Sequence, residues 1–130
     1  MQYYNKTPYL SEVAIKLADT STYGKFKLGA IIARKNKIIS LGTNSKKTHP
    51  LQRRFSSRPH LDAWQHAEIN ALTRVGKIDL EGADVYVARR LADGSIGSSR
   101  PCRGCQSALH DHGIRRMIYW ENGKWVKEKV

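Results

Sequence analysis

The cysteines are the feature that most constrains this chain. Of its 130 residues only two are cysteines, and they stand three positions apart in the segment Pro101-Cys102-Arg103-Gly104-Cys105. A disulfide between them would close a very short loop and add little stability, because cross-link stabilisation grows with loop length. The pair is therefore better suited to metal binding or redox chemistry. Free thiols are typical of reducing compartments, so we expect the protein to work in the cytoplasm.

A second motif, His66-Ala67-Glu68, precedes the cysteines along the chain. Zinc prefers thiolate and imidazole ligands, and three protein ligands leave a fourth position for water. We predict that His66, Cys102 and Cys105 bind Zn²⁺, and that Glu68 exchanges protons with a water at the fourth position. Each motif alone is weak, and a redox dithiol beside a core histidine is the alternative. In this order they match a known pattern of zinc enzymes that act on nucleobases.

Hydrophobic periodicity predicts a chain of mixed α/β class. Helices are expected over residues 11–19, 64–75 and 102–111, and strands over residues 28–33, 38–41, 84–90, 115–120 and 125–130. Ser11 is the expected N-cap of the first helix. The helix between the third and fourth strands permits them to pair in parallel, whereas the Asn122-Gly123 turn makes the last two an antiparallel hairpin. Trp120 and Trp125 flank this turn as a predicted cross-strand pair. We expect one domain over residues 1–130, with three α-β-α layers around a five-stranded mixed sheet.

The charge of the chain is strongly positive. It carries 23 Lys and Arg against 11 Asp and Glu, for a formal net charge of +12. Such a field attracts anions, so a phosphorylated nucleotide or a single-stranded nucleic acid is the expected partner. The alternative is a basic surface that serves only solubility. No apolar run approaches the ~20 residues that cross a membrane, and no signal peptide is evident, so no membrane partner is expected.

A long basic segment, residues 42–63, precedes the histidine motif. A loop of this length in a small domain is expected to be functional. Its residues Thr48, His49, Arg53 and Arg54 are candidate substrate contacts, because guanidinium groups match phosphate geometry. The alternative is a solvated basic loop.

These motifs resemble the cytidine and deoxycytidylate deaminase superfamily. The resemblance runs from about residue 28 to residue 119 and includes QHAEINAL (65–72), DVYVARR (84–90), PCRGC (101–105) and HGIRRMIYW (112–120). It implies a cytidine-deaminase-like fold, zinc dependence and a homo-oligomer. It further implies that Asn44 contacts the sugar or base and that the backbone N–H of Ala67 contacts the pyrimidine carbonyl. The chain has Arg100 where members of the superfamily often have Glu or Ser.

The leading hypothesis from the sequence is hydrolytic deamination of a cytosine nucleotide, dCMP or a related compound, to the uracil nucleotide. The first alternative is a deaminase acting on cytosine or adenine in single-stranded DNA or RNA, which the net charge favours. An alternative of another class is a zinc-containing nucleic-acid-binding module without catalysis. Such a module would close the zinc site with a fourth protein ligand, for which His49, His110 and His112 are candidates.

Overall fold

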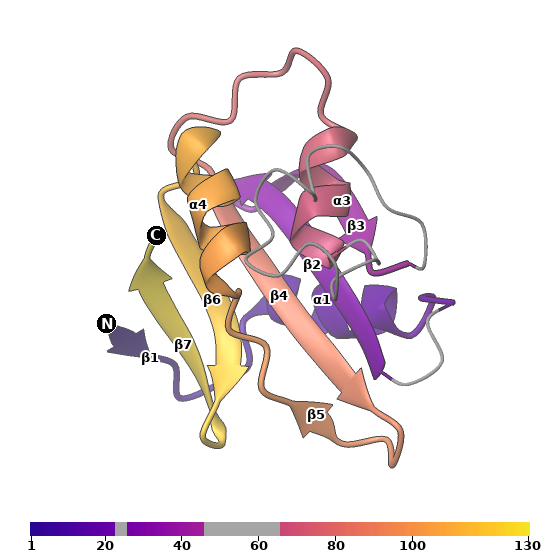
Figure 1. The fold of residues 1–130 in the computed structure, drawn as a ribbon. Coiled ribbons are helices and arrows are strands. Elements are labelled where there is room, and N and C mark those ends of the chain that lie inside the picture. Colours follow the sequence, from indigo (N-terminus) through magenta and orange to yellow (C-terminus); the bar gives the residue numbers. More distant parts are fainter. Residues whose placement is uncertain (23–25, 46–65) are drawn as a thin grey trace.

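The computed structural model describes residues 1–22, 26–45 and 66–130 of the chain. Figure 1 shows the arrangement of its helices and strands. In chain order the elements are β1 (Gln2–Tyr3), α1 (Tyr9–Ala18), β2 (Phe26–Arg34), β3 (Lys37–Thr43), α3 (Ala67–Thr73), β4 (Asp84–Leu91), β5 (Ile96–Gly97), α4 (Arg103–Asp111), β6 (Arg116–Glu121) and β7 (Lys124–Lys129).

The strands form one mixed sheet in the order β1-β7-β6-β4-β2-β3, with β5 added beside β4. β4 and β6 run parallel, because α4 carries the chain across the sheet between them, and the other pairs are antiparallel. The β2–β3 hairpin turns at Lys35 and Asn36, whose φ angles of 52° and 64° suit a two-residue turn that follows the strand twist. β4 pairs with β6 over Asp84–Tyr86 and, further along, with β5 at Arg89 and Arg90.

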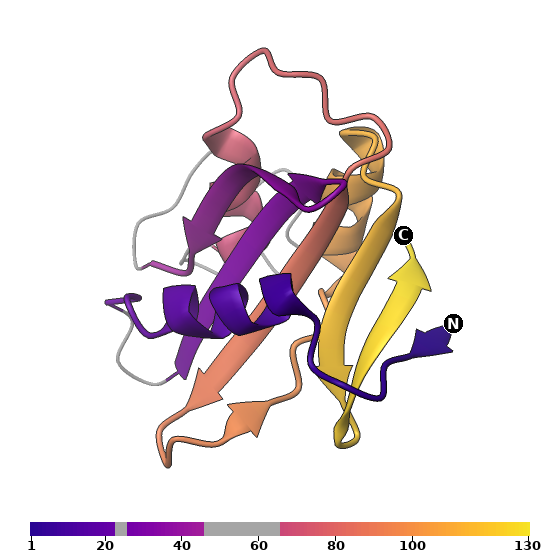
Figure 2. The same ribbon diagram turned by 180° about the vertical axis from the view of Figure 1, so that it is seen from behind.

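Helices cover both faces of this sheet. Alternate residues of β4 point to opposite sides, so Val85 and Val87 pack with α3 and α4, whereas Ala88 packs on the other side with α1. Figure 1 shows α3 and α4 in front of the sheet, and Figure 2, seen from the opposite side, shows α1 crossing the other face. The three-layer α-β-α class predicted from the sequence is therefore confirmed.

β3 and α3 approach each other at backbone distance. A Cβ built on Gly42 would lie 2.4 Å from the carbonyl oxygen of Ala67 and 2.4 Å from the amide nitrogen of Ala71. Only glycine permits this contact. The Ser40 hydroxyl also donates a hydrogen bond to the Ala71 carbonyl at 2.7 Å. The start of α3, which carries the histidine motif, is thus fixed directly against the sheet.

The sheet contains the five expected strands and two short ones that the sequence analysis missed. β1 pairs with β7 through Gln2 and Tyr3, and β5 lies within the Gly/Ser-rich segment expected to be a plain connection. The C-terminal hairpin is antiparallel as predicted. Its Trp120 and Trp125 are direct partners, with ring centroids 5.4 Å apart and an interplanar angle of 68°, which confirms the predicted pair.

The start of the first helix differs from the prediction. α1 begins at Tyr9 with Pro8 as N-cap, and the Pro8 carbonyl accepts hydrogen bonds from the amides of Ser11 and Glu12. Ser11 therefore lies inside the helix, fully buried, and the prediction of an N-cap at Ser11 is wrong. The earlier start buries Leu10, which is 2% exposed, in the core between α1 and the sheet. Proline suits this position because its fixed φ already matches the extended cap conformation.

Candidate functional site

The two helix starts in the front layer carry the motif residues. His66 is the N-cap of α3 and Cys102 is the N-cap of α4, both with extended backbone, and Cys105 lies one turn into α4. The amide of Cys105 donates to the Cys102 sulfur at 3.4 Å, which tightens the first turn of α4. α3 and α4 contact each other and run in the same direction, so their N-termini lie together (Figure 1).

Three donor atoms converge between these helix starts. The Nδ1 atom of His66 lies 3.3 Å from the Cys105 sulfur and 3.7 Å from the Cys102 sulfur, and the three atoms lie within 4.8 Å of one another. Ordinary zinc–ligand bond lengths in a tetrahedron place nitrogen and sulfur donors about 3.6 Å apart. Two thiols and one imidazole at this spacing fit a zinc ion. Within residues 1–22, 26–45 and 66–130 no other histidine, cysteine or carboxylate joins this group.

The pKa values of the two thiols are shifted in opposite directions. The hydrogen bond from Cys105 lowers the pKa of Cys102 to about 4, although partial burial opposes the shift. The same contact, together with burial, raises the pKa of Cys105 above its ordinary value. The pair therefore holds one thiolate readily, and a divalent cation that binds both sulfurs would displace the remaining proton.

Glu68 lies in the first turn of α3 and is 3% exposed. Burial raises the pKa of its carboxyl group, and the nearby His66 opposes this shift. A raised pKa makes a carboxyl group a better proton acceptor when it is ionised, and the same group can later return the proton. Glu68 thus has the environment of an acid–base residue beside the donor group.

A cavity of about 180 Å³ opens beside Glu68 and the metal-donor group. Its walls come from the ends of β2 and β4, the segment before α4 and the two helix starts. The lining residues are Phe26, Leu28, His66, Glu68, Arg89, Ser98, Ser99, Arg100 and Cys102. This volume is below that of a typical pocket for a whole drug-sized ligand, so it suits a single ring system with the rest of the ligand at its mouth.

Two residues expected to contact substrate by resemblance lie near this region. Ala67 is the first residue of α3, where the backbone N–H groups have no partner within the helix. Asn44 is fully buried, and its side-chain oxygen accepts hydrogen bonds from the Leu28 amide at 2.9 Å and the Ser21 hydroxyl at 2.6 Å. Its side-chain nitrogen donates to the Phe26 carbonyl at 3.2 Å. Asn44 therefore anchors the start of β2, and its contact with a nucleotide stays a prediction.

Four predicted substrate contacts lie outside the described residues: Thr48, His49, Arg53 and Arg54. Of the histidines considered as a fourth metal ligand, His49 also lies there. His110 and His112 are at the far end of α4 from Cys102, and the Nδ1 of His112 is hydrogen-bonded to the Ala108 carbonyl at 2.7 Å. Neither joins the donor group.

Two arginines of the cavity were not assigned from the sequence. Arg100 pairs with Glu128 of β7 at 3.1 Å, and its guanidinium lies 6.0 Å from the ring centroid of Tyr119. Arg89 follows Val85 and Val87 on the same face of β4. The alternation of β4 was the signal that could have placed Arg89 beside the site. From the sequence alone, Arg89 is part of the basic end of a predicted strand.

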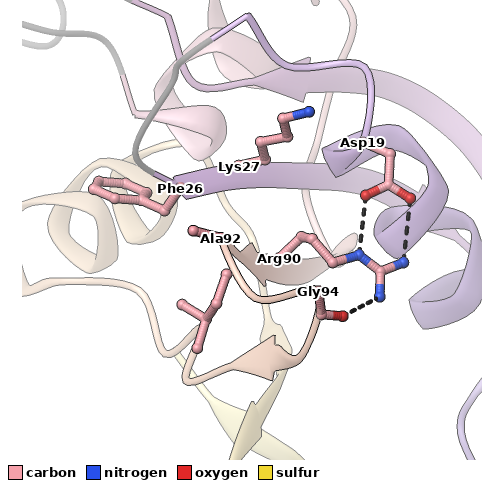
Figure 3. Close-up of a pocket in the computed structure, with 7 residues that line it drawn as sticks. Asp19, Phe26, Lys27, Arg90, Ala92 and Gly94 are labelled. Atoms are coloured by element: carbon pink, nitrogen blue, oxygen red, sulfur yellow. Dashed lines mark hydrogen bonds and ion pairs between the residues drawn. The ribbon is translucent and has the colours of Figure 1, made fainter.

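A second cavity, of about 560 Å³, shares Phe26 with this site and lies around the β4–β5 turn. Figure 3 shows Arg90 reaching across it to both carboxylate oxygens of Asp19 and to the Gly94 carbonyl. The charge of Arg90 is thereby neutralised, and none of the residues lining this cavity is a predicted metal ligand or acid–base residue.

Similarity to known proteins agrees with a metal site formed by His66, Cys102 and Cys105. The family described as the cytidine and deoxycytidylate deaminase zinc-binding region matches residues 4–121. The deoxycytidylate deaminase of Mycobacterium phage D29 is 26% identical over 126 residues, covering 85% of this chain and 91% of that protein.

Two solved structures share the fold. The dCMP deaminase of cyanophage S-TIM5 in apo form superposes with a TM-score of 0.53 at 19% identity, over 86% of this chain and 82% of that one. The same enzyme in complex with dCMP and dUMP superposes with a TM-score of 0.52 at 18% identity, over 87% of this chain and 82% of that one.

The helices in the described part of the chain are all too short or too polar to span a membrane.

Proposed function

Because the chain belongs to the cytidine and deoxycytidylate deaminase family, we propose that it hydrolyses a cytosine nucleotide, dCMP or a close relative, to the uracil nucleotide and ammonia. The observation that carries the proposal is the buried Glu68 beside the converged donors of His66, Cys102 and Cys105. A site that only stabilises a fold has no need of a buried carboxyl group next to three ligands.

His66, Cys102 and Cys105 are the residues that would hold the zinc ion. The fit rests on the donor types and on the nitrogen–sulfur distances of 3.3 Å and 3.7 Å. When bound, zinc supplies a water of lowered pKa at the open fourth position. A metal held by three protein ligands is typical of catalytic rather than structural zinc sites.

Glu68 is the residue that moves protons in this proposal. Its carboxylate accepts a proton from the attacking water and returns it to the ring nitrogen next to the reacting carbon. A second proton passes through Glu68 to the amine, which leaves as ammonia while the ring carbon becomes a carbonyl. Burial keeps the pKa of Glu68 raised, so that both directions of transfer are accessible. The backbone N–H of Ala67, at the start of α3, is the proposed donor to the pyrimidine carbonyl.

The preference for a phosphorylated substrate rests on two observations. The Mycobacterium phage relative is a deoxycytidylate deaminase that matches most of both chains. The net charge of +12 attracts a phosphate-bearing ligand. Asn44, Thr48, His49, Arg53 and Arg54 are the further proposed contacts. We also propose a single domain over residues 1–130, assembly into a homo-oligomer and, because the thiols must stay free, a reducing cytoplasmic location.

The test is ammonia release from cytidine, deoxycytidine, their monophosphates, adenosine monophosphate and a single-stranded oligonucleotide. We expect turnover of the cytosine monophosphates. Glu68→Gln should retain zinc and melting temperature but lose about 100-fold or more in kcat, because proton transfer is removed. Near-normal activity of Glu68→Gln would contradict the role given to this residue.

The net charge also favours a second candidate, a deaminase of single-stranded nucleic acid. Such an enzyme would act on the oligonucleotide, fail on free monophosphates and lose activity steeply with salt. The same screen at low and high salt separates the two. A zinc module without catalysis would release no ammonia from any of these compounds.

A further inference from the structure

Arg89 is placed to contact the part of a substrate that lies beyond the reacting ring. It lines the same cavity as His66 and Glu68. The segment that leads to the cysteines crosses β4 at Val87, because the Ser99 hydroxyl donates a hydrogen bond to the Val87 carbonyl at 2.8 Å. Arg89 lies two residues beyond Val87 on the same face of β4, which corresponds to about 6.6 Å along the strand. The guanidinium thus approaches the cavity from the end remote from the donor group.

No acidic residue among the described ones neutralises Arg89. The ion pairs formed within residues 1–22, 26–45 and 66–130 are those of Arg90, Arg100 and Arg116. The Nε atom of Arg89 is buried and has no hydrogen-bond partner in that part of the chain. Arg89 as a whole is half-buried, and a buried N–H group without a partner is costly. An acceptor on a ligand in the adjoining cavity would satisfy it.

Phe26 holds the guanidinium of Arg89 in a defined orientation. The central carbon of the guanidinium lies 4.6 Å from the centroid of the Phe26 ring. Arg89 and Phe26 come from the neighbouring strands β4 and β2 and are two register positions apart, because Arg89 lies opposite Leu28. Stacking on an aromatic ring occupies a face of the guanidinium and leaves its edge, which carries the N–H donors, available for a planar or tetrahedral anion.

The other arginine of the cavity does not offer the same opportunity. Arg100 donates to both carboxylate oxygens of Glu128, at 3.2 Å and 3.1 Å. Its charge is therefore balanced within the protein. Of the two arginines that line the cavity, Arg89 is the one without a carboxylate partner within residues 1–22, 26–45 and 66–130.

We infer that Arg89 binds the 5′-phosphate of the substrate and so determines preference for a nucleotide over a nucleoside. This inference rests on the proposed function, because it assumes a cytosine compound in the cavity. The guanidinium fork offers two parallel N–H donors to phosphate oxygens, a contact stronger than a neutral hydrogen bond. The ring then lies toward Glu68 and the phosphate lies at the cavity mouth.

The test compares dCMP with deoxycytidine as substrates of the zinc-loaded wild type and of Arg89→Met. We expect kcat/KM for dCMP to fall about 10- to 100-fold in the variant, the value of a charge-assisted hydrogen bond. The value for deoxycytidine should be unchanged. Arg89→Lys keeps the charge and loses the two parallel N–H donors, so its kcat/KM for dCMP should lie between those of the wild type and Arg89→Met. Equal losses for both substrates, or no loss for dCMP, would overturn the inference.

Arg90→Met is the matched control, because Arg90 is the next residue of β4 and points to the opposite face, where it pairs with Asp19. It should leave the ratio of the two kcat/KM values at the wild-type level. Zinc content and melting temperature report folding, and if Arg89→Met does not fold, the ratio measured for Arg89→Lys decides. A wild type that deaminates neither compound overturns the proposed function alone. Calorimetric affinities for dCMP and deoxycytidine then decide the role of Arg89, with the loss again expected only for dCMP.

Discussion

Gly42→Ala should damage the active site from a position outside it. The added Cβ would lie 2.4 Å from backbone atoms of Ala67 and Ala71, whereas ordinary contacts begin at 3.4 Å. β3 and α3 would therefore have to separate by about 1 Å, since neither backbone can rotate away from the contact. Overpacking of this kind costs about 1–3 kcal/mol of unfolding free energy.

The same movement would displace the start of α3, which carries His66 and Glu68. A misplacement of about 1 Å in a catalytic constellation can cost about 100-fold in rate. We therefore expect kcat/KM for dCMP, measured by ammonia release per folded and zinc-loaded molecule, to fall by about this factor. Urea unfolding measures the accompanying loss of stability.

Gly29→Ala provides the matched control. A Cβ at Gly29 would lie 2.5 Å from the Ala14 carbonyl oxygen and 2.7 Å from the Ala18 amide nitrogen, so the clash is similar but falls on α1, behind the sheet. It should lower the unfolding free energy by a similar amount and leave kcat/KM per folded molecule unchanged. If both variants lose activity equally, or if Gly42→Ala is destabilised yet fully active, the link between this contact and the site is refuted.

Two further predictions concern the C-terminal hairpin. Trp125→Ala should lower the unfolding free energy by about 3–5 kcal/mol in urea titration, because this 3% exposed ring packs in the core and on Trp120; a loss below 1 kcal/mol would contradict that packing. Hydrogen bonding to Arg100 lowers the pKa of Glu128. Its carboxylate therefore stabilises the fold fully at pH values above the ordinary pKa of 4.5, and this contribution is lost as the pH falls through the lowered pKa. Glu128→Gln should remove up to about 1 kcal/mol at neutral pH, and the difference from wild type should vanish in acid; a difference independent of pH would exclude this origin.

Local sequence pattern predicted the central strands and, to within one residue, the start of α4. The helix expected from residue 64 was placed too early, because His66 is an extended N-cap and α3 begins at Ala67. β4 begins with alternating valines, β6 is a short apolar and aromatic run, and the Asn122-Gly123 turn determines the hairpin after them. The two-residue strands β1 and β5 are too short to show such a pattern, and they are defined only by their pairing with β7 and β4. The start of α1 was misplaced because burial of Leu10 outweighed the capping preference of Ser11.

For the site, residue chemistry was sufficient for the metal donors and insufficient for their surroundings. Spacing and donor type indicated His66, Cys102 and Cys105, which the structure brings together. The alternation of β4 could have placed Arg89 on the face of the site, but the absence of a nearby carboxylate among the described residues is a property of the assembled sheet. A charged residue in a sequence gives no sign of whether its counter-charge lies within the protein or in a ligand.

The parallel pairing of β4 with β6 has a consequence for how the metal centre comes into being. The histidine donor precedes β4 and the sulfur donors follow it, so the ligand atoms meet only when the intervening chain has entered the sheet. Contacts between such distant segments form late, because a long loop must close first. A metal ion bound by these three residues would cross-link segments that lie 36 positions apart in the sequence, and so would stabilise the state in which α3 and α4 are packed side by side.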